Sequence, residues 1–303
     1  MNWKILIIAG ILACAFLAGS LEVPGREGTL PPPLAKALKN PESVKELDLS
    51  YQDLKAVPPE IGKLVNLENL DLSGNSITRI SPELFSLARL KVLSLDRNNL
   101  TELPDGFGKL AALEDLSFRH NRLKKLPDDF EKMKSLHTLW LEHNQMTPFP
   151  SVITRLPSIQ TLYLTGNHFQ AVPPAIGRLK KLQALELMWN RLEGIPPEIG
   201  DLSSLTSLDL RGNKIKALPR EIGKLGRLEF LYLGGNGLTT LPEEIGGLSK
   251  LQFLALDQNR LTALPGSLGK LTGLRTFHLI KNPLSSEEKK KIKALLPGTA
   301  VTF

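Results

Sequence analysis

The sequence predicts an α/β solenoid, in which short strands and short helical turns alternate along one stacked chain. Three observations carry this prediction. An apolar pattern recurs every 23 residues from Val44 onward, leucine dominates the apolar positions, and an asparagine returns at one fixed place in the pattern. Because a fixed period of this length is the signature of repeat architectures, the 303 residues are expected to form one elongated repeat domain.

Eleven units follow one another without a break in register, and the last is truncated. They begin at Val44, Leu67, Leu90, Leu113, Leu136, Ile159, Leu182, Leu205, Leu228, Leu251 and Leu274. The unit "LEFLYLGGNGLTTLPEEIGGLSK", residues 228–250, shows the pattern LxxLxLxxNxLxxLPxxIGxLxx. Positions 4 and 6 of the unit alternate as in a strand, whereas positions 18 and 21 have helical spacing. A unit this small cannot bury its apolar side chains alone, so neighbouring units must stack.

This pattern resembles the leucine-rich repeat family, in the subclass that carries LPxxIGxL in its outer segment, over about residues 44–284. The resemblance implies a right-handed horseshoe with a parallel β-sheet on its concave side and short helical or 3-10 turns on its convex side. Together with an N-terminal export signal and the "SSEEKKKIKALLP" tail, the repeats are similar to secreted or lipoprotein leucine-rich-repeat proteins of bacteria. The resemblance therefore implies protein binding rather than catalysis.

Position 9 of the unit predicts a structural ladder. The first unit has Gln52 there, and the ten others have Asn75, Asn98, Asn121, Asn144, Asn167, Asn190, Asn213, Asn236, Asn259 and Asn282. A buried asparagine can bond the backbone of its own turn and of the adjacent turn, which leaves few polar groups unpaired. Since identical residues in every unit do not define one site, we expect no catalytic role for them.

Both ends of a solenoid need caps, because the terminal units otherwise expose their core. The stretch "LAKALKNPESV" predicts a short helix over about 33–38. At the other end, Ser285 and Glu288 have the spacing of a capping box that opens a helix. Ile292, Leu295 and Leu296 share one face of this helix, and the final "AVTF" is compatible with one more strand.

The first twenty residues differ in composition from the rest. A positive charge at Lys4 precedes an apolar run over 5–19, which is short for a membrane span and typical of an export signal. Small residues at 18–20 fit a cleavage site, and "ILAC" also resembles a lipobox, in which Cys14 would be lipidated. Cleavage after about Ser20, lipidation of Cys14 and a retained anchor therefore all remain open. Each places the protein outside the cytoplasm, secreted or associated with the cell envelope or outer membrane.

The sequence thus divides into four parts. They are an export signal over 1–20 (or a lipoprotein signal ending at Cys14), a linker and N-terminal cap over 21–43, eleven repeats over 44–284, and a C-terminal capping helix and tail over 285–303. No second domain is indicated, and the expected state is a monomer.

The rare residue types point to the concave face. In this family positions 2, 3, 5, 7, 8 and 10 are exposed there, and these positions hold all five histidines, all three tyrosines and both tryptophans beyond the signal. We predict a partner-binding surface made of Trp140, Tyr163, Met188, Trp189, Arg119, His120, Glu142, His143 and Tyr232. The aromatic centre with a mixed charged rim suits a protein partner.

Three other interpretations of this surface stay open. Large side chains can simply pack against each other across strands. The aromatic rings can instead stack on sugars, so a glycan is a second candidate ligand. A third possibility is a structural or scaffolding envelope component that has no discrete ligand.

The remaining signals are weaker. The formal charge is +7, but pairs such as Glu60–Lys63 place much of the basic charge on a solvated outer face, so nucleic-acid binding is not expected. His120 and His143 lie at strand spacing, yet no third zinc ligand follows from the pattern. No phosphate loop, nucleophile elbow or metalloprotease motif occurs. We therefore predict a protein without cofactor or metal that is not an enzyme.

Overall fold

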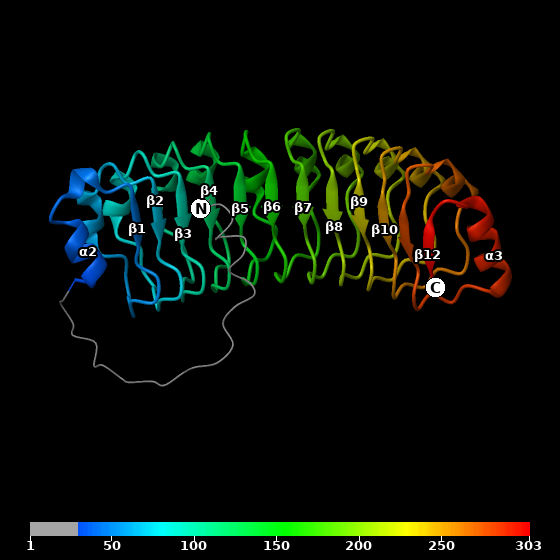
Figure 1. Cartoon of the computed structure of the whole chain (residues 1–303), viewed down its shortest axis with the longest axis horizontal. Helices are drawn as coiled ribbons and strands as arrows, with labels where there is room; N and C mark the ends of the chain where they lie inside the picture. Colours follow the sequence, from blue (N-terminus) through cyan, green and yellow to red (C-terminus); the bar gives the residue numbers. More distant parts are fainter. Residues whose placement is uncertain (1–29) are drawn as a thin grey trace.

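The computed structural model describes residues 30–303, and Figure 1 shows them as one gently curved body that runs from helix α2 (Pro32–Ala37) to helix α3 (Ser286–Leu295). The predictions for the export signal, for lipidation of Cys14 and for the start of the linker lie outside the described residues. Within the described part of the chain, no helix is long and apolar enough to cross a membrane.

A single parallel sheet of twelve strands lies along this body, and its strand order follows the sequence. The strands are β1 (Glu46–Asp48), β2 (Asn69–Asp71), β3 (Val92–Ser94), β4 (Asp115–Ser117), β5 (Thr138–Trp140), β6 (Thr161–Tyr163), β7 (Ala184–Glu186), β8 (Ser207–Asp209), β9 (Phe230–Tyr232), β10 (Phe253–Ala255), β11 (Thr276–His278) and β12 (Ala300–Thr302). Each of the first eleven strands occupies positions 3 to 5 of its unit. The structure therefore confirms the predicted solenoid, with one strand per 23-residue unit.

Short 3-10 helices form the opposite, convex layer. They are η1 (Pro41–Ser43), η2 (Pro59–Lys63), η3 (Pro82–Ser86), η4 (Phe107–Lys109), η5 (Asp128–Lys132), η6 (Ser151–Arg155), η7 (Pro174–Arg178), η8 (Pro197–Asp201), η9 (Arg220–Lys224), η10 (Glu243–Gly247) and η11 (Gly266–Lys270). A proline of the repeat precedes most of them, as at Pro127, whose φ of −69° fits the start of a helical turn. Because paired strands sit about 4.8 Å apart while helical turns need more room, the sheet lines the concave side.

The core fills the space between these two layers. In the eighth unit all seven apolar positions of the pattern are buried, and they are Leu205, Leu208, Leu210, Ile215, Leu218, Ile222 and Leu225. The middle residue of a strand points into this core, whereas its two neighbours point to the concave face. The predicted orientation of Trp140 is therefore correct: Leu139 is fully buried, and Trp140 lies on the concave side.

The asparagines of position 9 tie each unit to the one before it. In all ten, Oδ1 accepts a hydrogen bond from the backbone N–H 21 residues earlier, and Nδ2 donates to the carbonyls 26 and 3 residues earlier. Asn144, for example, bonds Leu123 N at 2.9 Å, Phe118 O at 2.9 Å and Leu141 O at 3.1 Å. Backbone groups that no strand pairs are satisfied in this way.

Both ends of the sheet are closed by further elements. At the N-terminal end, helix α2 buries Leu34 against the first unit. At the C-terminal end, helix α3 buries Ile292, and β12 pairs with β11 as a twelfth strand. Only half of the predicted capping box forms. The Ser285 hydroxyl accepts from the N–H of Glu288, but the Glu288 carboxylate turns to the N–H of Leu264 at 2.9 Å, which ties the cap to the repeats.

The ladder predicts a large loss of stability when one asparagine is truncated. Asn144→Ala leaves buried N–H and C=O groups without their side-chain partner, so it should lower the free energy of unfolding by about 2–4 kcal/mol. Asn99→Ala removes an asparagine side chain that lies outside the ladder and should change it by less than about 0.5 kcal/mol. Urea unfolding followed by circular dichroism compares the two, and equal effects would contradict a ladder role.

Candidate functional site

The strand register sets out the concave face in rows. Position 5 places Trp140, Tyr163, Glu186, Asp209 and Tyr232 on five consecutive strands, each directly opposite the next. Positions 7 and 8 add two further rows just beyond the strand ends. Residues that are far apart in sequence thereby become neighbours about 4.8 Å apart in the sheet.

Trp140 and Tyr163 form the aromatic centre. Their rings are stacked at 5.7 Å between centroids with 5° between planes, and both side chains are half-buried. The guanidinium carbon of Arg119 lies 5.6 Å from the Trp140 ring centroid, on the side of the preceding unit. Trp140 is thus held between a cation and a phenol ring, and both of its faces are occupied.

Arg119 is itself fixed by Asp96. Its Nε lies 2.9 Å from Asp96 Oδ2, and its backbone N–H donates to Oδ1 of the same carboxylate at 2.8 Å. The Ser117 hydroxyl also donates to Asp96. Both side chains of the pair are only 14% exposed, so the charge of Arg119 is largely neutralised within the protein. Asp96, Arg119 and Trp140 are called the first cluster.

A second arrangement of the same kind lies four units further on. Arg211 bonds both carboxylate oxygens of Asp209, with Nε at 3.0 Å from each, and its guanidinium carbon lies 4.9 Å from the Tyr232 ring centroid. Arg211 also reaches the sulfur of Met188 at 3.2 Å. Asp209, Arg211 and Tyr232 are called the second cluster. The sequence prediction included Tyr232 but missed Arg211, although both arginines occupy position 7 of their units.

Glu142 lies between the two clusters in an unfavourable environment. Burial raises the pKa of its carboxyl to about 8, although nearby Arg119 acts in the opposite direction. Its Oε2 is buried and has no hydrogen-bond partner among residues 30–303. Burial and the neighbouring Asp209 also raise the pKa of Glu186. The middle of the concave face therefore holds two partly buried carboxyl groups that make no ion pair within residues 30–303.

Position 8 has a left-handed backbone in every unit. The φ angles there lie between 50° and 68°, and the position is occupied by Tyr51, Gly74, Arg97, His120, His143, Gly166, Trp189, Gly212, Gly235, Gln258 and Lys281. Non-glycine residues in this conformation carry a penalty of about 1–2 kcal/mol. The recurrence of glycine at position 8 is the feature of the sequence that indicates this left-handed backbone. Trp189 is nevertheless 60% exposed at this strained place, where its indole covers Gly212.

His120 and His143 lie side by side in the same row. Their rings are stacked at 4.4 Å with 12° between planes, and the ring of His143 covers Gly166. Burial, and then the charge of His143, lower the pKa of His120, which favours a neutral ring near pH 7. Within the described residues, no group of three or more His, Cys, Asp or Glu side chains is placed to hold a metal ion.

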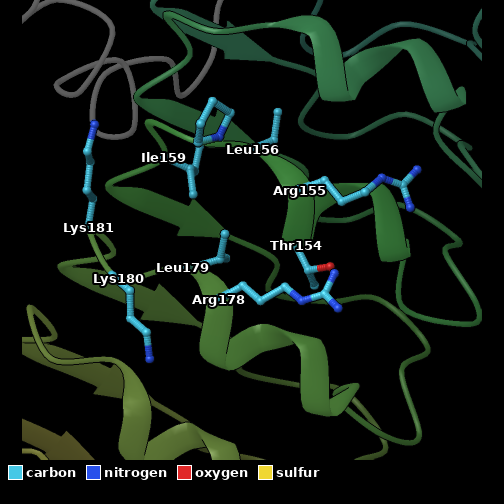
Figure 2. A pocket seen from close by; sticks show the side chains of 9 residues that line it. Thr154, Arg155, Leu156, Ile159, Arg178, Leu179, Lys180 and Lys181 are labelled. Atoms are coloured by element: carbon cyan, nitrogen blue, oxygen red, sulfur yellow. The ribbon is translucent and has the colours of Figure 1, made fainter.

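One cavity of about 360 Å³ lies away from this face, on the flank between units five and six, and is lined by Thr154, Ile159, Arg178, Leu179 and Lys180 among others. Figure 2 shows Arg178 running alongside Thr154, while Lys180 extends outward. Most units have glycine where unit five has Thr154, and the glycines allow close stacking: a Cβ on Gly177 would lie 2.9 Å from Glu198 O. Thr154 lines the cavity at a position where most other units have no side chain.

The predicted surface residues thus form two groups. Arg119, Trp140, Glu142 and Tyr163 are direct neighbours, with His120 and His143 stacked beside them. The second group joins Met188 and Tyr232 through Arg211, next to the exposed Trp189. Asp96, Asp209 and Arg211 complete the surface and were not predicted as site residues.

Comparison with known proteins identifies the family. A sequence profile described as "Leucine-rich repeat region" matches residues 35–140 and 174–296, and one described as "Leucine rich repeat" matches 119–169. The chain belongs to the leucine-rich repeat family. Domains of this family typically mediate protein–protein interaction and are generally non-catalytic. A search of curated proteins finds no match.

Several solved structures are similar to this chain. A leucine-rich-repeat protein of Leptospira interrogans is 31% identical over 89% of this chain and 98% of its own, with a TM-score of 0.41. A TDR receptor is 30% identical over 86% of this chain, with a TM-score of 0.75, and the match spans about half (47%) of that receptor chain. An internalin (InlF) from Listeria monocytogenes is 20% identical over 92% of this chain and 99% of its own, with a TM-score of 0.62, and shows the fold alone.

The environment of Glu142 predicts a pH-dependent stability. The unfolded chain releases this proton near the ordinary pKa of 4.5, whereas the folded chain keeps it up to about pH 8. The contribution of protonated Glu142 to stability is therefore fully present below its pKa in the unfolded chain. It is lost as the pH rises through its pKa in the folded chain. Glu142→Gln has no proton to release, so relative to the parent its free energy of unfolding should rise by about 1–3 kcal/mol between pH 5 and pH 9.

Thermal and urea unfolding at several pH values would measure this difference. Glu102→Gln, which changes an exposed carboxylate outside the strands, is the matched control and should show no pH-dependent gain. Parallel pH profiles for Glu142→Gln and the parent would contradict the assigned burial.

Proposed function

We propose that this protein is an exported, non-enzymatic binding protein whose concave face recognises a protein partner. The contact residues are Trp140, Tyr163, Met188 and Trp189, and Arg119, His120, Glu142 and His143 set partner choice. One observation carries the proposal: the indole of Trp189 is 60% exposed on the same face as the stacked Trp140–Tyr163 pair. A large exposed aromatic side chain near ordered aromatic rings is typical of an interaction surface.

Rigidity supports the same conclusion. The first cluster fixes Trp140 through Arg119, and the second cluster fixes Tyr232 through Arg211. Side chains that are already ordered lose little conformational freedom when a partner binds. The TDR receptor that matches over 86% of this chain is described as a receptor, which agrees with a recognition role for the repeats.

The same geometry favours a protein over a glycan. Sugar recognition by aromatic side chains uses a free ring face, but both faces of Trp140 are covered, one by Arg119 and one by Tyr163. Charged groups adjoin Trp140, and the exposed indole of Trp189 adds an apolar contact, a mixture that suits a protein interface. A scaffolding role without a ligand would give no reason for so large an aromatic side chain to be 60% exposed there.

Alanine substitution of Trp140, Tyr163 and Trp189 together tests the concave face. In a crosslinking pull-down, the triple variant should lose at least about 90% of the captured partner, as expected when central aromatic contacts are removed. Its circular dichroism spectrum should remain that of the parent. Tyr51→Ala, which removes an equally strained and exposed aromatic residue at the far end of the sheet, should retain capture. Undiminished capture by a folded triple variant would refute the proposed surface.

Export is proposed on the composition of residues 1–20 alone, and an attachment to the membrane through this segment or through Cys14 belongs to the same proposal. In a bacterial host the full chain should be exported and processed near Ser20, and Cys14→Ala should not change the mature mass. Intact mass spectrometry of the fractionated protein measures this. A diacylglyceryl group on Cys14 would establish the lipoprotein form instead, and an unprocessed cytoplasmic chain would refute export.

A further inference from the structure

The two clusters leave an acidic segment between them. Each arginine is already paired, Arg119 with Asp96 and Arg211 with Asp209. Neither Glu142 nor Glu186 has an ion-pair partner within residues 30–303. Although the whole chain carries a formal charge of +7, the centre of its concave face is therefore short of positive charge.

Tyr163 separates the two carboxyl groups. In the strand register Tyr163 lies opposite Glu186 on one side and opposite Trp140 on the other. Glu142 follows Trp140 by two residues in the same unit. The three groups are close enough that Glu142 and Glu186 both raise the pKa of the Tyr163 hydroxyl, after burial as the larger cause. The phenol ring therefore stands between the two carboxyl groups.

Two polar atoms in this segment have no partner. Glu142 Oε2 is buried without a hydrogen bond within the part of the chain that the structure describes, and so is Thr165 Oγ1. Thr165 occupies the same row as Glu142, one unit further, and only 8% of it is exposed. Buried polar atoms left unpaired destabilise a folded protein by about 1–3 kcal/mol each. A bound donor that draws the Glu142 carboxyl out of this position would remove part of that cost.

We propose that the concave face between the two clusters accepts an arginine or lysine side chain of the protein partner, with Glu142 and Glu186 as its acceptors and Tyr163 between them. The proposal rests on the proposed function and names the chemistry of its partner. Charge complementarity is the argument. A basic side chain would compensate Glu186 and would favour release of the Glu142 proton, whereas an acidic side chain would add negative charge beside Glu186. A neutral side chain would do neither.

The arginines nearest to these carboxyl groups are already paired, so the cation has to come from the partner. Because Arg119 and Arg211 are both engaged by aspartates, neither can turn to Glu142 or Glu186 without breaking its own ion pair. Met188, bonded through its sulfur to Arg211, closes the segment on the side of the seventh unit. The flanking aromatic rings Trp140 and Tyr232 then limit where the remainder of a bound chain can lie.

A peptide array tests whether the protein prefers basic side chains. Labelled full-length protein is applied to decapeptides that contain arginine or lysine and to matched peptides in which citrulline or acetyl-lysine replaces them. The basic forms should bind at least about tenfold better than their neutral isosteres, because only they compensate a buried carboxylate. The Glu142→Gln, Glu186→Gln double variant should lose this preference. Equal signals for basic and neutral forms, including no signal from either, overturn the proposal.

Two controls separate this proposal from the broader one. The Glu102→Gln, Glu193→Gln variant makes the same change in charge at exposed sites outside the strands and should keep the preference. If the double variant keeps the preference while the Trp140, Tyr163, Trp189 triple variant loses all binding, the concave face binds but not through these carboxylates. If the triple variant still binds basic peptides with the parent's preference, the binding surface lies elsewhere and both proposals fail.

Discussion

The hydrogen bonds of the buried asparagines hold the units of this solenoid in register, and the rest of the structure depends on them. Each strand has only three residues and so makes few backbone pairs of its own. Each ladder asparagine adds bonds to its own turn and to the preceding unit, as Asn144 does with Leu141, Phe118 and Leu123. A slip of one residue would break these bonds and turn the leucines away from the core.

Because the register is fixed, the position of a residue within the repeat determines where it lies on the concave surface. It sets Trp140 against Tyr163 and His120 against His143, and it gives the residue before each asparagine a left-handed backbone. Glycine satisfies that conformation without strain, as Gly166 and Gly212 do in their units. The large side chains at the same position elsewhere are therefore a departure from what the fold alone requires.

Charge is distributed differently inside the concave face than over the whole chain. The total is positive, but the arginines nearest the aromatic centre are each neutralised by an aspartate, at Asp96 and Asp209. This pairing orders the rings that the arginines contact. It also leaves Glu142 uncompensated, because the cations close to it are already engaged. The arginine–aspartate ion pairs are therefore the common cause of the ordered aromatic rings and of the unpaired carboxyl group.

The sequence by itself determined the fold, the strand positions and which side chains share the concave face, because a 23-residue period specifies neighbours by simple addition. It placed Trp140 beside Tyr163 for that reason. Only the tertiary structure decided that Arg211 contacts Tyr232 and Met188, that Oε2 of Glu142 is buried without a partner within residues 30–303, and that a cavity lies beside Thr154. These outcomes depend on where long side chains turn and how water is excluded between units, and a periodic pattern contains no information on either.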